Sequence, residues 1–263
     1  MPNSVVAGES RSYFAQLFAL ARLSAVQLVR APSHARRAEA ALRLRRQLLL
    51  IAAIGGGLVI VLMISFDATE ITLMPPRGTA ALWPARFLTD FGKDAYVLST
   101  LLAALVAIAL LSPLLHGPWR ARFLRLGTHV EFLLLAVASS NLVAEILKYA
   151  IGRGRPFVGG KTSAFHFVPF AGTEAYFSLP SAHAVTAFAL AFAVGAVWPR
   201  ARIAMFVYAA VIAGTRLALL AHHPSDVVAG ATVGIFGAMV VRYWFAVRRL
   251  GFAIRFDGEI VPF

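Results

Sequence analysis

The chain has no cysteine among its 263 residues and few charged residues of any kind. The missing thiols exclude a disulfide-rich secreted scaffold, a cysteine nucleophile and a thiolate metal site. Only 14% of the residues are charged, against about 25% in ordinary soluble domains. Hydrophobic residues make up 59%, and the mean hydropathy is +0.75. This composition excludes a disordered chain and a water-soluble enzyme, and it predicts an all-α polytopic membrane protein.

Six apolar runs are candidates for membrane-spanning helices, each of which needs about 20 residues. They lie at 48–65, 95–115, 126–148, 183–198, 203–220 and 227–247. The third run carries Glu131 and Glu145, so we expect one of its faces to point into the bundle. The fourth has only 16 residues and can span only if its first turn projects into a polar cavity. The sequence therefore predicts a six-transmembrane-helix bundle.

The amino-terminal region is polar and basic. Residues 12–30 alternate apolar and basic positions in a helical rhythm, which predicts an amphipathic helix lying on the membrane surface. An ordinary cytoplasmic helix is an equally weighted alternative. We accordingly divide the chain into a cytoplasmic amphipathic and basic segment (1–47), a six-helix membrane domain (48–250) and a cytoplasmic carboxyl-terminal tail (251–263).

Acidic residues are scarce, with 12 against 25 basic ones, and the net charge is +13. Such a charge can indicate nucleic-acid binding. Here, however, most arginines flank apolar runs, so we expect no nucleic-acid partner. Seventeen basic residues fall on the side of both termini and eight on the other side. The positive-inside rule therefore predicts a bacterial inner (plasma) membrane protein with both termini in the cytoplasm and the loops after spans one, three and five in the periplasm.

The loops after the third and fifth spans collect polar residues that are costly at membrane depth unless they are paired or line a cavity. These residues are Lys148, Arg155, Ser181, His183, Arg216, His222 and Asp226, and Ala182 lies between Ser181 and His183. Arginine donors match phosphate oxygens, and the start of a helix after Pro180 offers free N–H groups to an anion. The loops therefore predict a phosphate-sized oxyanion pocket.

Two histidines can turn such a pocket into a catalyst, one attacking phosphorus and the other protonating the leaving oxygen. Chemistry alone does not choose between His222 and His223. Asp226 lies four residues after His222, close enough to hydrogen-bond its ring and fix the tautomer. No His or carboxylate ligand set stands out, so the residues require no metal.

Taken singly, several of these residues have ordinary structural explanations. Lys148 could snorkel to the interface or pair with Glu145 one turn earlier, and Ser181 and Asp226 could be helix N-caps. Four more polar residues of the same loop are left outside the site: Arg153 and Lys161 as solvated loop residues, His166 and Glu174 without a role. Only the joint occurrence of the pocket residues favours a functional site.

Read in order, the pocket residues form Lys148-x6-Arg155-Pro156, Pro180-Ser181-Ala182-His183 and Thr215-Arg216-x5-His222-x3-Asp226. This pattern resembles the signature of the type-2 phosphatidate phosphatase superfamily, K-x6-R-P, P-S-G-H and S-R-x5-H-x3-D. The resemblance covers 95–247. Ala182 replaces the family's glycine and Thr215 its serine, which keeps the backbone N–H and the hydroxyl.

The resemblance implies a role for each residue. Phosphate binding falls to Lys148, Arg155, Ser181, Ala182 and Arg216. His183 is implied as general acid, His222 as nucleophile passing through a phosphohistidine, and Asp226 as its orienting partner, with no cofactor and no metal.

We therefore expect a metal-independent lipid phosphatase at the outer face of the membrane. Undecaprenyl diphosphate, phosphatidate and phosphatidylglycerol phosphate are the expected kinds of substrate. Two alternatives stay open: a lipid phosphotransferase with the same site, and an anion channel or transporter using the same cations. The oligomeric state is not predicted.

Overall fold

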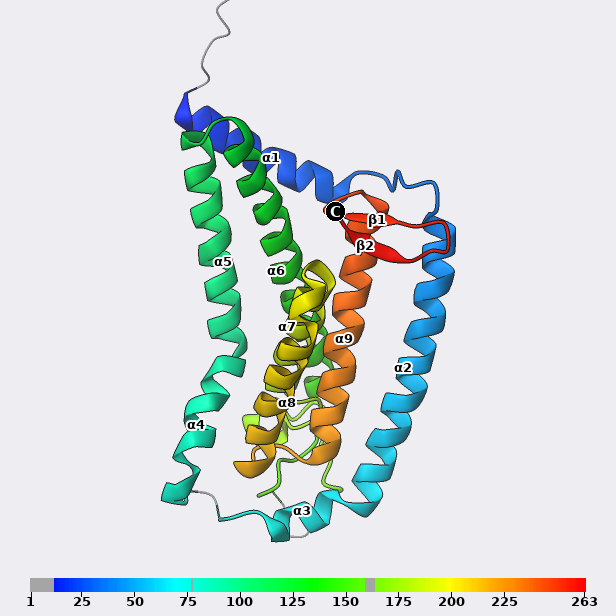
Figure 1. Ribbon diagram of the computed structural model, residues 1–263. Helices are drawn as coiled ribbons and strands as arrows, with labels where there is room; N and C mark the ends of the chain where they lie inside the picture. Colours follow the sequence, from blue (N-terminus) through cyan, green and yellow to red (C-terminus); the bar gives the residue numbers. More distant parts are fainter. Residues whose placement is uncertain (1–11, 77, 159–163) are drawn as a thin grey trace, which may run out of the picture.

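The computed structural model describes residues 12–76, 78–158 and 164–263. The six predicted spans form an antiparallel helical bundle (Figure 1). They are α2 (Arg37–Ser65), α5 (Asp94–Leu111), α6 (Gly117–Ile151), α7 (Ala182–Val197), α8 (Arg202–Ala218) and α9 (Pro224–Val247). Within the described ranges, five helical segments are long and apolar enough to cross a membrane, and α7, with 16 residues, is the short one. The predicted all-α membrane fold is confirmed, with a six-helix count that depends on α7.

The short helix α7 is surrounded by protein, which explains why it need not match the bilayer. Ala187, Ala189 and Ala191 are fully buried, and α6, α8 and α9 all pack against this helix. A Cβ atom at Gly234 of α9 would lie only 2.4 Å from the carbonyl oxygen of Val185. Small residues of this kind let two helix backbones approach closely inside a membrane. The packing of α7 therefore allows its first turn to start inside the bundle.

Several helices extend beyond the apolar runs seen in the sequence. α2 begins at Arg37 rather than at 48, and α6 begins at Gly117 rather than at 126. The added turns are rich in arginine, alanine and leucine, which favour helix, and arginine can snorkel along an apolar surface. The expected boundary at 47/48 therefore falls inside α2.

The helix predicted at 12–30 is present as α1 (Tyr13–Val29) and lies across one end of the bundle (Figure 1). The Tyr13 hydroxyl donates to the carbonyl of Leu110 at 2.9 Å, and the Trp244 indole donates to the carbonyl of Leu28 at 3.0 Å. α1 thus joins the end of α5 to the end of α9. Phe18, with other apolar side chains of α1, stays exposed, as expected of a helix at a membrane surface.

The last residues form a hairpin rather than an unstructured tail. β1 (Phe252–Ile254) pairs antiparallel with β2 (Ile260–Pro262), in a register that places Phe252 opposite Pro262. The Phe252 ring packs 4.9 Å from the ring of Phe132 in α6. Burial of this aromatic pair fixes the hairpin to the same end of the bundle as α1 (Figure 1).

Short elements connect the longer helices. At the end that carries α1 these are η3 (Ser112–Leu114) and η5 (Pro199–Ala201). At the opposite end they are α3 (Asp67–Leu73), η1 (Ala80–Leu82), α4 (Trp83–Thr89), η2 (Asp90–Gly92) and η4 (Glu174–Tyr176). The sequence patterns did not reveal α3 or α4. Both lie at the end of the bundle where the two polar loops also lie (Figure 1).

Candidate active site

The fold brings all the predicted pocket residues to the end of the bundle away from the termini. α6 and α8 end there, whereas α7 and α9 begin there. Their placement is as follows: Lys148 in the last turn of α6, Arg155 in the following loop, Ser181 at the N-cap of α7, Ala182 and His183 in its first turn, Arg216 in the last turn of α8, His222 in the loop before α9, and Asp226 in the first turn of α9. The antiparallel bundle therefore joins three separate stretches of sequence.

A glycine turn directs the loop after α6 back towards the bundle. Gly152 ends α6 with φ +59°, and a Cβ atom there would lie 1.8 Å from the carbonyl oxygen of Val168. Only glycine fits this left-handed conformation and this close approach. The amide N–H of Val168 donates to the carbonyl of Gly152 at 2.7 Å, and that of Gly154 to His166 at 2.8 Å. The loop thus folds back on itself.

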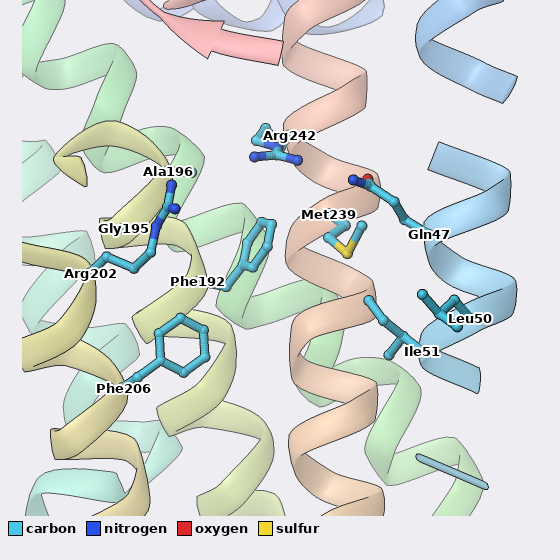
Figure 2. A pocket seen from close by; sticks show the side chains of 10 residues that line it. All are labelled: Gln47, Leu50, Ile51, Phe192, Gly195, Ala196, Arg202, Phe206, Met239 and Arg242. Carbon is cyan, nitrogen blue, oxygen red and sulfur yellow. The ribbon is translucent and has the colours of Figure 1, made fainter. Parts of the chain in front are cut away.

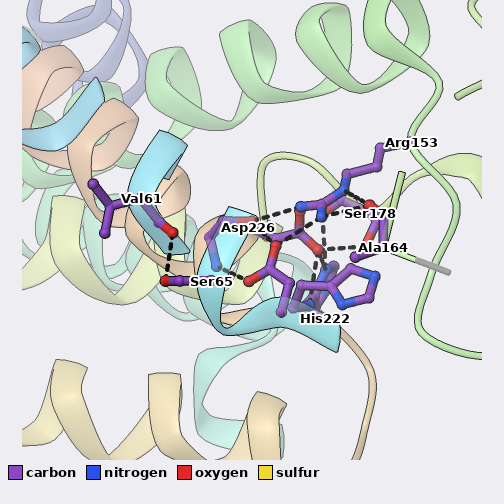
Figure 3. Close-up of polar contacts among 10 residues, drawn as sticks. Val61, Ser65, Arg153, Ala164, Ser178, His222 and Asp226 are labelled. Atoms are coloured by element: carbon purple, nitrogen blue, oxygen red, sulfur yellow. Dashed lines mark hydrogen bonds and ion pairs between the residues drawn. The ribbon is translucent and has the colours of Figure 1, made fainter. Parts of the chain in front are cut away.

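This loop places Arg153 in the interior, and the prediction that it is a solvated loop residue is wrong. Arg153 is the largest fully buried side chain among the described residues. Its guanidinium lies 2.5 Å from Asp226 Oδ1 (Figure 3). It also lies 2.7 Å from Asp67 Oδ2 and donates to Ser225 Oγ at 2.6 Å. A buried charge needs such partners. Asp67 comes from a distant part of the chain, so local sequence could not show this network. Lys161 lies outside the described residues.

The His222 ring is held by a backbone carbonyl rather than directly by Asp226. Its Nδ1 lies 2.9 Å from the carbonyl oxygen of Ser178 but 3.9 Å from Asp226 Oδ2. Asp226 Oδ2 instead accepts hydrogen bonds from Ser178 Oγ at 2.5 Å and from the N–H of His223 at 2.9 Å. Because a carbonyl only accepts, Nδ1 carries the hydrogen and Nε2 keeps its lone pair. Asp226 therefore acts on His222 through Ser178 (Figure 3).

Positive charges surround the two histidines of the pocket. Burial lowers the pKa of His222 well below its usual value, and the nearby charges of Arg216, Arg155 and Lys148 lower it further. The same three cations also act on His183. The His222 ring is therefore neutral at neutral pH, as a nucleophile must be. The three cations therefore lie within electrostatic range of both rings.

The pocket cations keep contacts that fix their positions. Lys148 is buried, and its Nζ lies 2.6 Å from Oε1 of Glu145, which is 49% exposed. Lys148 therefore forms the ion pair with Glu145 that the sequence suggested, and it also lies among the predicted pocket residues. Arg216 donates to Thr89 Oγ1 of α4 at 2.7 Å. α4 therefore supports the pocket from a segment that has no recognisable motif.

Two buried polar atoms of the pocket, Ser181 Oγ and His183 Nε2, make no hydrogen bond within the described part of the chain. Buried polar atoms normally have a partner, in the protein or outside it. Ser181 stands at the N-terminus of α7, where the first N–H groups of a helix have no intrahelical acceptor. Phosphate oxygens can accept hydrogen bonds from the Ser181 hydroxyl and from these backbone N–H groups.

Sequence reasoning missed the acidic residues of α3. Asp67 and Glu70 are buried, and Asp67 also accepts a hydrogen bond from the Ser225 N–H at 3.1 Å. Burial raises the pKa of Glu70 to about 8, and the neighbouring Asp67 and Asp226 add to this effect. The sequence did contain a signal for them. The chain has only 12 acidic residues, and Asp67 and Glu70 come directly after an uncharged apolar run, where carboxylates indicate a functional site. No group of three or more His, Asp or Glu suited to a metal ion occurs in the ranges described.

Together, the bundle and the pocket define an integral membrane enzyme built to handle a phosphate group. Comparison with known proteins agrees. The sequence profile described as PAP2 superfamily matches residues 130–250. Two bacterial relatives are both named lipid A 1-phosphatase. The protein from Rhizobium johnstonii is 33% identical over 201 residues, 76% of this chain and 82% of the relative, and the one from Rhizobium etli is 32% identical over 197 residues, 74% and 84% respectively.

The chain belongs to the PAP2 superfamily. The predicted family and enzyme class, a membrane lipid phosphatase, are therefore confirmed. A solved structure of a transmembrane PAP2-type phosphatidylglycerolphosphate phosphatase from Bacillus subtilis is also similar. It is 18% identical, with a TM-score of 0.49, and the match covers 76% of this chain and 93% of that one.

Proposed function

We propose that this protein hydrolyses the phosphate ester of a membrane lipid, with His222 as the nucleophile. The observation that carries the proposal is the hydrogen bond from His222 Nδ1 to the carbonyl of Ser178, at 2.9 Å. It leaves the Nε2 lone pair available in a ring that burial and three cations keep neutral. A neutral, oriented imidazole among fixed positive charges is suited to attack on phosphorus.

The proposed reaction has two steps. The negative charge of the bound phosphate offsets the cations and favours the protonated form of His183. Nε2 of His222 attacks phosphorus, the bond from phosphorus to the lipid oxygen breaks, and the His183 imidazolium gives its Nε2 proton to the leaving oxygen. Water then attacks the phosphorus of the phosphohistidine, one of its protons passes to His183, and the bond from phosphorus to His222 Nε2 breaks, so that inorganic phosphate leaves. Lys148, Arg155 and Arg216 stabilise negative charge on the phosphoryl oxygens throughout.

The remaining pocket residues orient the phosphate and the nucleophile. Ser181 Oγ and the N–H of Ala182 face the phosphate at the start of α7. Asp226 is a positioning residue that holds Ser178, whose carbonyl holds the ring of His222. No step in this scheme uses a metal ion, so we expect full activity in the presence of a chelator.

We propose lipid A, through its 1-phosphate, as the substrate class to test first, because both relatives carry the name lipid A 1-phosphatase. The pocket lies at one end of the bundle, so a phosphate headgroup can reach it while the acyl chains stay in the hydrocarbon layer. The distribution of basic residues supports a periplasmic location for this end of the bundle.

The test is phosphate release by the purified protein in detergent. Lipid A, phosphatidate, phosphatidylglycerol phosphate and undecaprenyl diphosphate are supplied separately, with and without chelator. We expect release from lipid A and complete loss of release in His222→Ala. The matched control is His166→Ala, since His166 contacts Tyr176 outside the pocket and should keep most of the activity.

Labelled lipid phosphate identifies the intermediate and the acceptor. We expect label on the denatured protein that is stable to base and labile to acid, and that is absent from His222→Ala. Label that moves to a second lipid instead of to inorganic phosphate identifies a phosphotransferase. Full activity of His222→Ala, or complete loss of activity with chelator, contradicts the proposed mechanism.

A further inference from the structure

A second cavity with basic residues lies far from the active site, near the end of the bundle that carries α1. It has a volume of about 380 Å³ and lies between α2, α7, α8 and α9 (Figure 2). Arg202 of α8 and Arg242 of α9 line it, together with Gln47 of α2. Arg242 follows Asp226 by 16 residues on the same helix, which corresponds to about 24 Å. The cavity is therefore distinct from the phosphate pocket.

The two arginines have no carboxylate partner. Neither Arg202 nor Arg242 forms an ion pair within the described ranges. Glu259 acts electrostatically on Arg242 but pairs with Arg255 at 3.1 Å. The Nε atom of Arg242 is buried without a hydrogen-bond partner in the described part of the chain. Two like charges thus share one cavity, which favours an anion there.

The local packing holds both guanidinium groups in the cavity. Arg242 lies over the ring of Phe192 in α7, 4.9 Å from its centroid. Gly195 makes room for Arg202, because a Cβ atom at this position would lie 3.2 Å from Arg202 Cγ. The aromatic contact stabilises a cation without neutralising it. Arg242 is thereby held in place with its charge intact, while Arg202 packs against Gly195.

The rest of the lining is apolar and belongs to the membrane region. Leu50 of α2 is 60% exposed, and with Ile51 and Phe206 it forms the apolar side of the cavity. An inorganic anion makes no favourable contact with these apolar side chains. A phospholipid has both a phosphate for the arginines and acyl chains for the apolar side. Basic pockets between membrane helices on the cytoplasmic side are suited to anionic lipid headgroups.

We propose that this cavity binds an anionic phospholipid of the leaflet that faces the termini. Arg202 and Arg242 contact its phosphate, and its acyl chains lie along Leu50, Ile51 and Phe206. Because this lipid bridges α2 to α8 and α9, its binding stabilises the folded bundle. The proposal does not depend on the reaction at His222.

The experiment measures the thermal unfolding of the full chain in a non-ionic detergent. Phosphatidylglycerol, phosphatidylcholine or inorganic phosphate is added in increasing amounts. We expect phosphatidylglycerol alone to raise Tm. The double variant Arg202→Gln with Arg242→Gln should need about tenfold more phosphatidylglycerol for the same rise in Tm. Arg200→Gln removes one charge from an exposed position at the same end and serves as the control, with the wild-type response.

Three outcomes overturn the proposal: an equal response of the double variant, an equal effect of phosphatidylcholine, or the full effect with inorganic phosphate. If the double variant does not fold, the single variants Arg202→Lys and Arg242→Gln replace it. The first should retain phosphatidylglycerol in native mass spectra and the second should lose it; equal retention contradicts the proposal. The same measurements on His222→Ala separate this site from the active site, because the lipid response should persist there.

Discussion

His222 takes its orientation from the backbone of Ser178. The hydrogen bond between Nδ1 and the carbonyl, at 2.9 Å, selects one tautomer. Asp226 does not hold the ring itself but accepts a hydrogen bond from the Ser178 hydroxyl. A carboxylate in direct contact stabilises a protonated imidazole. Its replacement by a neutral carbonyl, together with burial and nearby cations, keeps the ring unprotonated.

The depressed pKa of His222 has a consequence for the pH dependence of activity. Because burial and then Arg216, Arg155 and Lys148 disfavour the charged ring, His222 stays a nucleophile well below pH 6.5, the usual pKa of a histidine ring. We expect Arg216→Gln to have lower activity and an acid limb of kcat/KM displaced towards higher pH. Removal of one cation makes protonation of the ring easier. The measurement is a pH profile of kcat/KM for both proteins.

The substrate's own phosphate ionises near pH 6, so the comparison between proteins is what identifies His222. Arg200→Gln, at the opposite end, should leave the acid limb unchanged. An acid limb that stays in place in Arg216→Gln would show that His222 does not set it.

Among the elements, the short helix α3 contributes two buried acidic residues to the cluster beside the site. Asp67 in its first turn contacts the Arg153 guanidinium and the hydroxyl of Ser225, and thereby joins the end of α2 to the start of α9. Glu70, one turn later, is protonated at neutral pH because its pKa is about 8. This cluster holds Asp226, and through it the loop with His222.

We expect Asp67→Asn to reduce kcat while KM changes little, because Asp67 positions the catalytic loop but touches no substrate group. Loss of hydrogen bonds to a charged, buried partner should also cost about 2 kcal/mol of unfolding free energy. Kinetics and thermal unfolding in detergent measure the two effects. Asp257→Asn makes the same chemical change in an exposed ion pair with Arg43 and should alter neither quantity measurably.

An unchanged kcat in Asp67→Asn would mean that α3 does not position the site. A fall in Tm without a fall in kcat would restrict Asp67 to a structural role.

The elements differ in how far sequence could predict them. The long spans follow from apolar runs, because a bilayer requires continuous hydrophobic helix. α3 and the hairpin β1–β2 were missed because they depend on partners distant in sequence, Arg153 for α3 and Phe132 for the hairpin. α7 was predicted at its short length, but only the structure shows the surrounding helices that make this length possible.

At the scale of the whole molecule, the bundle separates its two ends. One end carries α1 and the hairpin (Figure 1). The arginine cavity lies near this end, and the candidate active site lies at the other. The excess of basic residues at the first end predicts that this end lies in the cytoplasm. A lipid substrate and a structural lipid would then occupy opposite leaflets.

The absence of cysteine allows a clean test of this orientation. Glu174 in η4 and Arg200 in η5 are exposed at opposite ends of the bundle. In spheroplasts, we expect a membrane-impermeant maleimide to label Glu174→Cys, and to label Arg200→Cys only after the membrane is opened. The reverse pattern of labelling would contradict periplasmic placement of the active site.

The sequence by itself determined the membrane fold and the family, and it predicted the residues of the phosphate pocket, because hydropathy and motif spacing are local properties of the chain. Only the tertiary structure decided what holds those residues: Asp67 against Arg153, and the Ser178 carbonyl against His222. These contacts join segments that the order of residues keeps apart. Their energies come from burial and from paired charges, which exist only once the helices have packed.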